Sequence, residues 1–301
     1  MIYTVTLNPA LDYVVHLDRL TVGTVNRSSG ENLYFGGKGI NVSTILHTLG
    51  VDTTALGFVA GFTGSAIEEG VRRQGIPTDF VRLEDGLSRI NVKIKTGQET
   101  EINGHGPVIP SDAIEQLFTR LDRLNEGDTL VLAGSIPGSL PPDIYEQILR
   151  RLSGRGVSSA VDTTGALLLS VLPYHPFLIK PNRQELGELF SGEASDDTAV
   201  AEQARELQRR GARNVLVSMA GDGSLLLTEE GHILRMGTPN GRVRNSVGAG
   251  DSMVAGFLAG YTRSHDYQTA LKWGTAAGSA TAFSDGLASA ADIQKIYQTI
   301  L

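Results

Sequence analysis

The order of apolar and polar positions along the chain predicts a repeated succession of strand and helix. Short apolar runs alternate with stretches in which apolar side chains recur every three or four positions, as in a helix with one buried face. Strands are predicted at 2–7, 53–58, 129–133, 158–162, 177–180 and 214–218, with a hairpin at 223–228 and 231–236. Helices are predicted at 39–49, 65–74, 111–124, 142–152, 197–210, 250–261, 267–282 and 290–300. This alternation predicts an α/β fold whose mostly parallel sheet is covered on both faces.

Two regions interrupt the alternation. Residues 12–18 with 26–35, and residues 89–102, read as strands with alternating polar and apolar positions and no helix between them. We expect them to form a small separate sheet from the discontinuous segments 12–35 and 88–103. Because so small a sheet is marginal alone, it should pack on the main body, on a partner subunit, or on both. No linker or repeat divides the chain, so we expect residues 1–301 to form a single domain.

Composition narrows the class of protein. The chain has 301 residues and no cysteine, which excludes disulfides, thiolate nucleophiles and cysteine-bound metals. A net charge of −7 argues against a basic nucleic-acid face. No apolar run approaches the roughly 20 residues of a membrane helix, and the first residues read as a strand rather than a signal peptide, so the cytoplasm is the expected location. Glycine is abundant, 36 of 301 residues, and often clustered, which indicates several functional turns.

Polar residues stand where the predicted parallel strands end. They are Asn8, Gly134 with Ser135, Asp162, Asn182 and the segment 218–221. In open α/β sheets, ligands bind at the carboxyl ends of the strands. We therefore expect these residues to converge on a binding edge.

The most informative segment is Asn245-Ser-Val-Gly-Ala-Gly-Asp251, which directly precedes a helical pattern. Backbone N–H groups at a helix start attract anions, and small residues let a phosphate approach them closely. An acid at the end of the turn can remove a proton from an attacking hydroxyl. From these residues alone, a tight turn in which Asp251 caps the helix remains an equal alternative.

A second glycine cluster covers residues 35–42. It is not a Walker A loop, because Asn32 and Gly39 stand where that motif needs Gly and Ser or Thr. A dinucleotide-binding fingerprint is missing as well. Lys38 supplies a point charge suited to phosphate, and Asn41 can bind a hydroxyl. A plain strand-to-helix turn is the alternative.

The small-sheet segments carry three charged residues that become candidate ligands because these segments lie beside Lys38. Asp12 can accept two vicinal sugar hydroxyls, although an exposed strand carboxylate is more often solvated. Arg27 and Arg89 would ordinarily be surface residues. Their place beside Lys38 makes them candidates for binding an anion.

Two further segments follow apolar strands. Asn182 and Glu185 lie three apart at a helix start, so both can face Mg²⁺ or its waters, or they can form a capping box. The segment 218–223 could pass beneath nucleotide phosphates, but many hairpins begin in this way.

Together these motifs, in order and over essentially the whole chain, strongly resemble the PfkB (ribokinase-like) family of carbohydrate kinases. Gly36 and Gly37 look like part of its first signature, residues 245–258 like its second, and Asn182 with Glu185 like its magnesium–phosphate motif. The resemblance implies a three-layer α/β/α sandwich in which the small sheet is a lid. It also implies ATP as co-substrate, Mg²⁺, a sugar-phosphate substrate and a homodimer clasped through the lid.

The resemblance also implies roles for individual residues. Asp251 would be the base, and the N–H groups of Gly248, Ala249 and Gly250 would form an anion hole. The sugar phosphate would be bound by Asp12, Gly36, Gly37, Lys38, Asn41, Arg89 and Ser135, with Arg27 reaching in from a partner subunit. ATP would be bound by Lys180, Asn182, Glu185, Ser218, Gly221, Gly223, Ser246, Ala277 and Gly278. Asn182 and Glu185 would hold Mg²⁺ through water.

Within the family, the segments look most like those of kinases that convert fructose 1-phosphate to fructose 1,6-bisphosphate. Family 6-phosphofructokinases often have Gly at the position of Lys38, and Ser246 and Ser88 stand where Thr is common. Kinases of tagatose 6-phosphate are the nearest alternative, because both substrates need the same cations, acid and anion hole. From another class, a non-catalytic sugar-phosphate sensor fits less well, since it would have no use for a base beside an anion hole. An NAD-linked dehydrogenase fits the alternation but lacks the fingerprint.

Overall fold

A nine-stranded sheet forms the centre of the computed structural model, which describes residues 1–190, 192, 194 and 196–300. The strand order is β13-β12-β11-β10-β9-β8-β1-β4-β5, parallel throughout except for β12 and β13. The strands are β1 (Ile2–Thr6), β4 (Thr53–Ala60), β5 (Val81–Leu83), β8 (Thr129–Ala133), β9 (Ser158–Asp162), β10 (Leu178–Ile179), β11 (Asn214–Ser218), β12 (Ser224–Leu227) and β13 (Ile233–Met236). The predicted parallel sheet and its antiparallel hairpin are thus confirmed.

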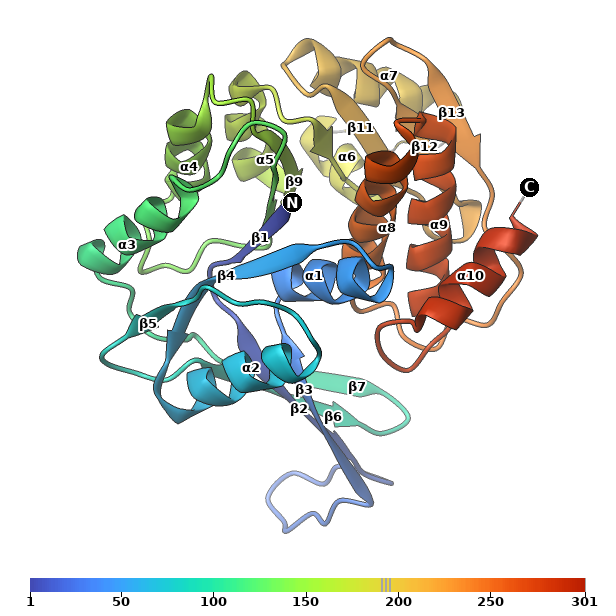
Figure 1. Ribbon diagram of the computed structural model, residues 1–301. Coiled ribbons are helices and arrows are strands. Elements are labelled where there is room, and N and C mark those ends of the chain that lie inside the picture. The colour runs from blue at the N-terminus through green and yellow to red at the C-terminus, as the bar shows by residue number, and fades with distance from the viewer. Residues whose placement is uncertain (191, 193, 195, 301) are drawn as a thin grey trace.

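Helices cover both faces of this sheet. One layer holds α3 (Ser111–Leu121), α4 (Ile144–Leu152), α5 (Gly165–Val171), α6 (Arg183–Phe190) and α7 (Asp197–Arg209). The other holds α1 (Lys38–Thr48), α2 (Gly61–Arg73), α8 (Ala249–Ser264), α9 (Tyr267–Ala282) and α10 (Ala290–Thr299). Successive residues of β8 alternate between the layers, Leu130 and Leu132 facing the first and Val131 the second. Figure 1 shows α3, α4 and α5 on one side and α8, α9 and α10 on the other.

Helices α8 and α9 pack unusually closely because glycines line their contact. A Cβ on Gly278 of α9 would lie 3.1 Å from the backbone oxygen of Ala249, the first residue of α8. A Cβ on Gly274 would lie 3.0 Å from the backbone oxygen of Met253. Gly256 and Gly260 of α8 meet α9 in the same way. The start of α8 is therefore held directly against the backbone of α9.

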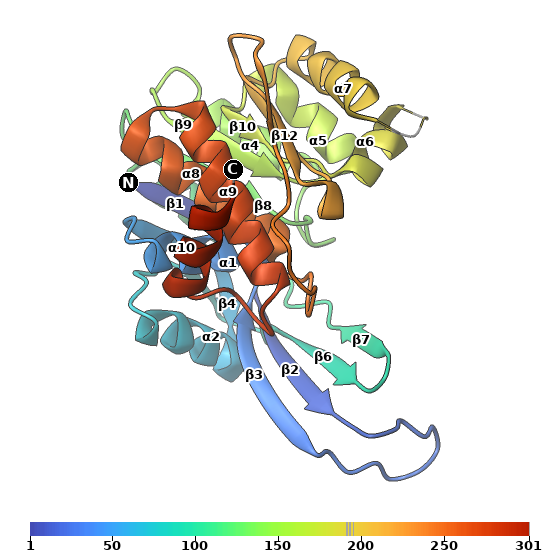
Figure 2. The ribbon, with the colours of Figure 1, turned by 90° about the vertical axis from the view of Figure 1, so that its right-hand side faces the viewer.

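The four strands outside the alternation form a second sheet, which we call the lid. Its strands are β2 (Ala10–His16), β3 (Gly30–Gly36), β6 (Arg89–Lys95) and β7 (Glu99–Asn103), in the order β3-β2-β6-β7. Asp12 on β2 pairs with Asn91 on β6 in a parallel register. Figures 1 and 2 show the lid projecting from the body. The chain crosses between body and lid four times, so the lid is tied to the body at several points.

Three elements had no predicted range: β5, α5 and α6, the last expected only as a helix start at Asn182. Strand β5 has only three residues, and α5 carries a run of leucines without helical spacing, so neither gave a periodic signal. None of the helices among the described residues is both long and apolar enough to cross a bilayer.

Candidate active site

A cavity of about 1530 Å³ opens at the carboxyl ends of the parallel strands, beside the lid and the start of α8. Most predicted site residues line it. They are Asp12, Gly37, Lys38, Asn41, Arg89, Lys180, Asn182, Glu185, Ser218, Gly221, Gly223, Ser246, Gly248, Ala249, Gly250, Asp251 and Gly278. Residues far apart in the sequence thus meet in one place.

Four predicted residues do not line this cavity. Gly36 is buried beneath Asp12, where a Cβ would lie 2.8 Å from the carboxylate Oδ2. Arg27 is exposed in the loop between β2 and β3, and Ser135 is exposed in the turn after β8. Ala277 is fully buried against Gly256 of α8. Within one chain, therefore, Gly36 can act only through Asp12, and Ala277 lies behind the cavity wall formed by its neighbour in α9.

The turn before α8 presents backbone N–H groups to the cavity. Gly248 is the N-cap and adopts the left-handed φ of +80° that favours glycine. The N–H of Ala249 donates to the backbone oxygen of Ser246 at 3.2 Å. Among the described residues, the N–H groups of Gly248 and Gly250 have no acceptor. They are thus available to an anion at the positive end of the helix dipole.

Asp251 lies in the first turn of α8 and is only 5 % exposed. Its Oδ2 accepts a 2.8 Å hydrogen bond from Nδ2 of Asn41. Burial, aided by the negative charge of Asp162, raises the pKa of Asp251 to about 6. Gly248 caps the helix without a side-chain bond, so the alternative in which Asp251 is the cap is wrong. A carboxylate with this pKa is well matched to general-base chemistry near neutral pH.

Asp162, at the end of β9, is the central charged residue that the sequence prediction left without a role. Its Oδ2 lies 3.0 Å from Nζ of Lys38, and its Oδ1 lies 3.3 Å from Nζ of Lys180. Burial opposes ionisation, but the two ammonium groups hold the pKa of Asp162 below its ordinary value. The signal was an acid closing an apolar strand at the predicted binding edge.

The two lysines are held close to the anion-binding turn. Burial would lower the pKa of Lys38, but the charges of Asp162, Asp251 and Glu185 raise it above its ordinary value. A Cβ on Gly250 would lie 3.3 Å from Nζ of Lys180. Both lysines therefore line the cavity together with the start of α8.

The lid supplies the opposite wall. Nδ2 of Asn91 donates to Oδ1 of Asp12 at 2.8 Å, and Nζ of Lys93 lies 3.5 Å from Oδ2 of Asp12. Arg89 also lines the cavity, and its burial lowers the pKa of the guanidinium although Asp12 opposes that shift. Asn91 had no predicted role, but it shares a strand face with Arg89, which is the signal that could have found it.

Asn182 and Glu185 form a reciprocal cap at the start of α6. The N–H of Asn182 donates to Oε2 of Glu185 at 2.7 Å, and the N–H of Glu185 donates to Oδ1 of Asn182 at 2.8 Å. The described residues contain no cluster of three or more His, Cys, Asp or Glu that would hold a metal by itself. The carboxylate oxygen of Glu185 outside this cap, Oε1, and the second lone pair of Asn182 Oδ1 suit a hydrated Mg²⁺ that is also bound by phosphate, because Mg²⁺ commonly keeps several waters.

Comparison with known proteins decides the family. Residues 5–294 match the family described as pfkB family carbohydrate kinase. The chain belongs to this family. A 1-phosphofructokinase of Bacillus subtilis is 47% identical over 296 residues, covering 98% of this chain and 97% of that protein. A D-tagatose-1-phosphate kinase of Bacillus licheniformis is 39% identical over 300 residues, covering 99% and 97%.

Solved structures agree with this placement in the pfkB family. Phosphofructokinase-2 of Escherichia coli, in complex with fructose-6-phosphate, superposes with a TM-score of 0.91 at 28% identity, covering 99% of this chain and 98% of that chain. The three-layer sandwich and the small second sheet confirm the expected ribokinase-like fold. The family also confirms the expectation of an ATP-dependent kinase.

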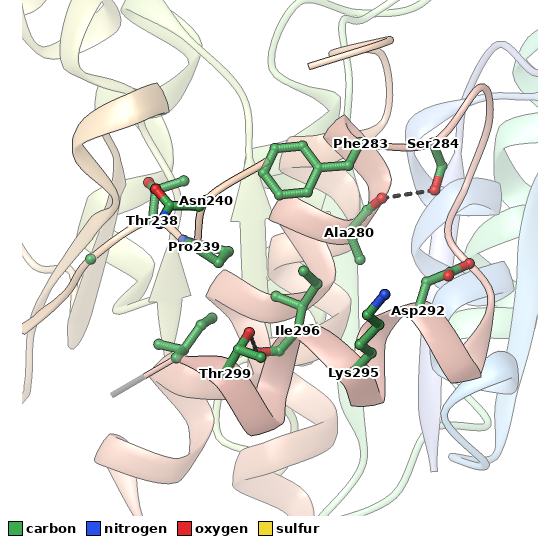
Figure 3. A pocket seen from close by; sticks show the side chains of 12 residues that line it. Thr238, Pro239, Asn240, Ala280, Phe283, Ser284, Asp292, Lys295, Ile296 and Thr299 are labelled. Carbon is green, nitrogen blue, oxygen red and sulfur yellow. Dashed lines mark hydrogen bonds between the residues drawn. The ribbon is translucent and has the colours of Figure 1, made fainter. Parts of the chain in front are cut away.

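This pfkB kinase has a second, smaller cavity of about 680 Å³, shown in Figure 3. It lies between the segment 237–240 and helices α9 and α10, and it shares Thr238 and Phe283 with the larger cavity. None of the predicted site residues lines it. The larger cavity is therefore the candidate active site.

Proposed function

We propose that this chain transfers the γ-phosphoryl group of ATP to the 6-hydroxyl of fructose 1-phosphate, giving ADP and fructose 1,6-bisphosphate. The observation that carries the proposal is Asp251, a buried carboxylate with a pKa of about 6 beside an anion-binding turn. The 47% identity to a 1-phosphofructokinase over nearly the whole chain supports this substrate.

In the proposed reaction, Asp251 removes the proton from the 6-hydroxyl as its oxygen attacks the γ-phosphorus. The new P–O bond forms while the bond from phosphorus to the ADP oxygen breaks. The N–H groups at the start of α8 and Lys180 and Lys38, both held by Asp162, stabilise the charge on the transferred group; for Lys38 this replaces the place on the resident sugar phosphate that the resemblance implied. Asp12 and Asn41 hold sugar hydroxyls, and Arg89 binds the resident phosphate.

ATP is proposed to lie on the other side of the cavity, along the segments 218–223 and 246–250 and against Gly278. Mg²⁺ would be held through water by Asn182 and Glu185, where it would neutralise charge on the nucleotide phosphates. Both residues line the cavity, which supports this assignment.

Tagatose phosphates are the second candidate substrates, favoured by the 39% identity to a D-tagatose-1-phosphate kinase and by 32% identity to a tagatose-6-phosphate kinase of Staphylococcus epidermidis. The test is kcat/KM measured side by side for fructose 1-phosphate, tagatose 1-phosphate and tagatose 6-phosphate. We expect the highest value for fructose 1-phosphate. A higher value for either tagatose phosphate overturns the assignment. Sugar-phosphate binding without ATP-dependent turnover would favour the sensor instead.

We also propose that the whole chain acts as one kinase domain in the cytoplasm and forms a homodimer through the lid. Leu33, Ile90 and Ile102 share one face of the lid and are 49%, 42% and 60% exposed, which supports burial against a second copy. Such a partner would bring Arg27 toward the neighbouring cavity. Light scattering should report a dimer that Ile102→Glu weakens; a wild-type monomer would contradict the proposal.

A further inference from the structure

Asn8 lies where the chain leaves the central sheet for the lid. It is half-buried, lies two residues beyond the end of β1, and does not line the active-site cavity. Its backbone oxygen accepts a 3.1 Å hydrogen bond from Nε of Arg89, the first residue of β6. Its side-chain Nδ2 donates to the backbone oxygen of His105 at 2.8 Å. Asn8, which lies in the first crossing between body and lid, therefore contacts two of the other three.

The segment that leaves the lid fits closely around the Asn8 amide. Gly106 has the left-handed φ of +86°, and a Cβ there would collide with Oδ1 of Asn8. The backbone can approach the amide this closely only because residue 106 lacks a side chain. The contact therefore depends both on the side chain of Asn8 and on the absence of a side chain at residue 106.

The same segment is linked to the sugar side of the lid. The N–H of Gly104 donates to Oδ1 of Asn91 at 3.2 Å, and Nδ2 of Asn91 donates to Oδ1 of Asp12 at 2.8 Å. Asn8 is therefore connected to Asp12 through the backbone of residues 104–106 and the side chain of Asn91. A separate hydrogen bond joins Asn8 to Arg89.

We propose that Asn8 is a positioning residue that orients the lid for the phosphorylated sugar. By accepting from Nε, its backbone leaves the two terminal nitrogen atoms of Arg89 free for the resident phosphate. Its amide fixes the exit segment and, through Asn91, the carboxylate of Asp12. The inference rests on the proposed function because it places the sugar phosphate at Arg89 and Asp12.

The test is Asn8→Ala, assayed for the KM of each substrate and for kcat. Asn8→Ala removes the amide hydrogen bond that fixes the exit segment and, through Asn91, Asp12, while the backbone oxygen that accepts from Arg89 remains. The sugar-phosphate KM should therefore rise about 3- to 10-fold. The KM for ATP should stay within about twofold, because ATP contacts lie across the cavity. Gly106→Ala should give the same pattern, and the double variant should be no worse than the stronger single one, because both disturb one contact.

Asn125→Ala is the matched control. Its Nδ2 also donates to a backbone oxygen, that of Arg123 at 3.0 Å, but in an exposed turn before β8, at the opposite edge of the sheet. It should leave both KM values unchanged. If Asn8→Ala does not fold, Asn8→Ser replaces it. An unchanged sugar-phosphate KM, or equal changes in both KM values, overturns the inference.

Failure of the proposed substrate would be distinguishable from failure of this inference. The wild-type protein reports which sugar phosphate it accepts, and the variants are then compared on that sugar phosphate. If no sugar phosphate is turned over, calorimetric Kd values for fructose 1-phosphate replace KM, with the same expected ratio of variant to wild type. An unchanged Kd overturns the role of Asn8.

Discussion

Replacing the proposed base should make the protein more stable while it removes activity. Burial raises the pKa of Asp251 from 3.8 to about 6 in the folded protein. Between these two values the folded state binds more protons than the unfolded state, so stability falls as pH rises. The shift of about two units corresponds to about 3 kcal/mol of destabilisation, fully present above pH 6 and absent below pH 4.

Asp251→Asn removes this penalty and keeps a side-chain oxygen that can accept from Asn41. At pH 7.5 the variant should therefore unfold with a free energy about 3 kcal/mol higher than wild type, or a Tm about 5 °C higher for a chain of this length. Its kcat should fall at least about 100-fold, because the base is lost. The two effects have one cause, the desolvation of a carboxylate beside the anion-binding turn.

The assay is urea unfolding of both proteins at several pH values between 4 and 8, combined with kcat at pH 7.5. The gain in stability should shrink as pH falls and vanish near pH 4. Asp85→Asn, which changes an exposed acid, should show no such pH-dependent gain. If Asp251→Asn is no more stable than wild type at pH 7.5, or if its gain grows as pH falls, the reasoning about burial is wrong.

Further predictions concern pH, charge and shape. Activity should fall below about pH 6 as Asp251 is protonated. In pH–rate profiles, Asp162→Asn should move this acidic limb to lower pH, because it removes a negative charge that raises the pKa of Asp251. An acidic limb that does not move would instead be due to the phosphate of the substrate. Arg89→Ala should raise the sugar-phosphate KM at least about tenfold in steady-state assays with little change for ATP, because it removes a charged hydrogen-bond donor; a rise for ATP alone would contradict the placement of the two substrates. Gly36→Ala should also raise the sugar-phosphate KM in these assays, because its Cβ would lie 2.8 Å from Oδ2 of Asp12; an unchanged value would argue against Asp12 as a sugar ligand.

Much of the fold could be predicted from the sequence because apolar residues recur along most of its strands and helices with a clear spacing. The apolar strand at 129–133 and the helix ending before Gly50 needed only local patterns. The small sheet could be separated because residues 89–102 alternate without an intervening helix. The short strand β5 and the leucine run of α5 could not be found, because three residues or a uniform apolar stretch carry no periodic signal.

The candidate site was predictable as a set of residue types but not as a network. Spacing suggested Asp251 and Lys38, whereas nothing local indicates that Asp162 pairs with Lys38, 124 positions away. The burial of Asp251 could not be predicted either, because it depends on the layers that pack around the start of α8. Arg27 cannot be assessed within one chain, because its expected place is on a partner subunit.

The close contact between α8 and α9 has a consequence for how such an enzyme can diversify. Glycine-lined helices leave the start of α8 little freedom, so substitutions there would disturb the chemistry for every substrate alike. The lid carries Asp12 and Arg89 on a separate sheet with its own strand register. Exchange of lid segments between relatives is therefore a direct route to altered sugar preference with the phosphoryl-transfer machinery intact, and directed libraries should concentrate on strands β2 and β6.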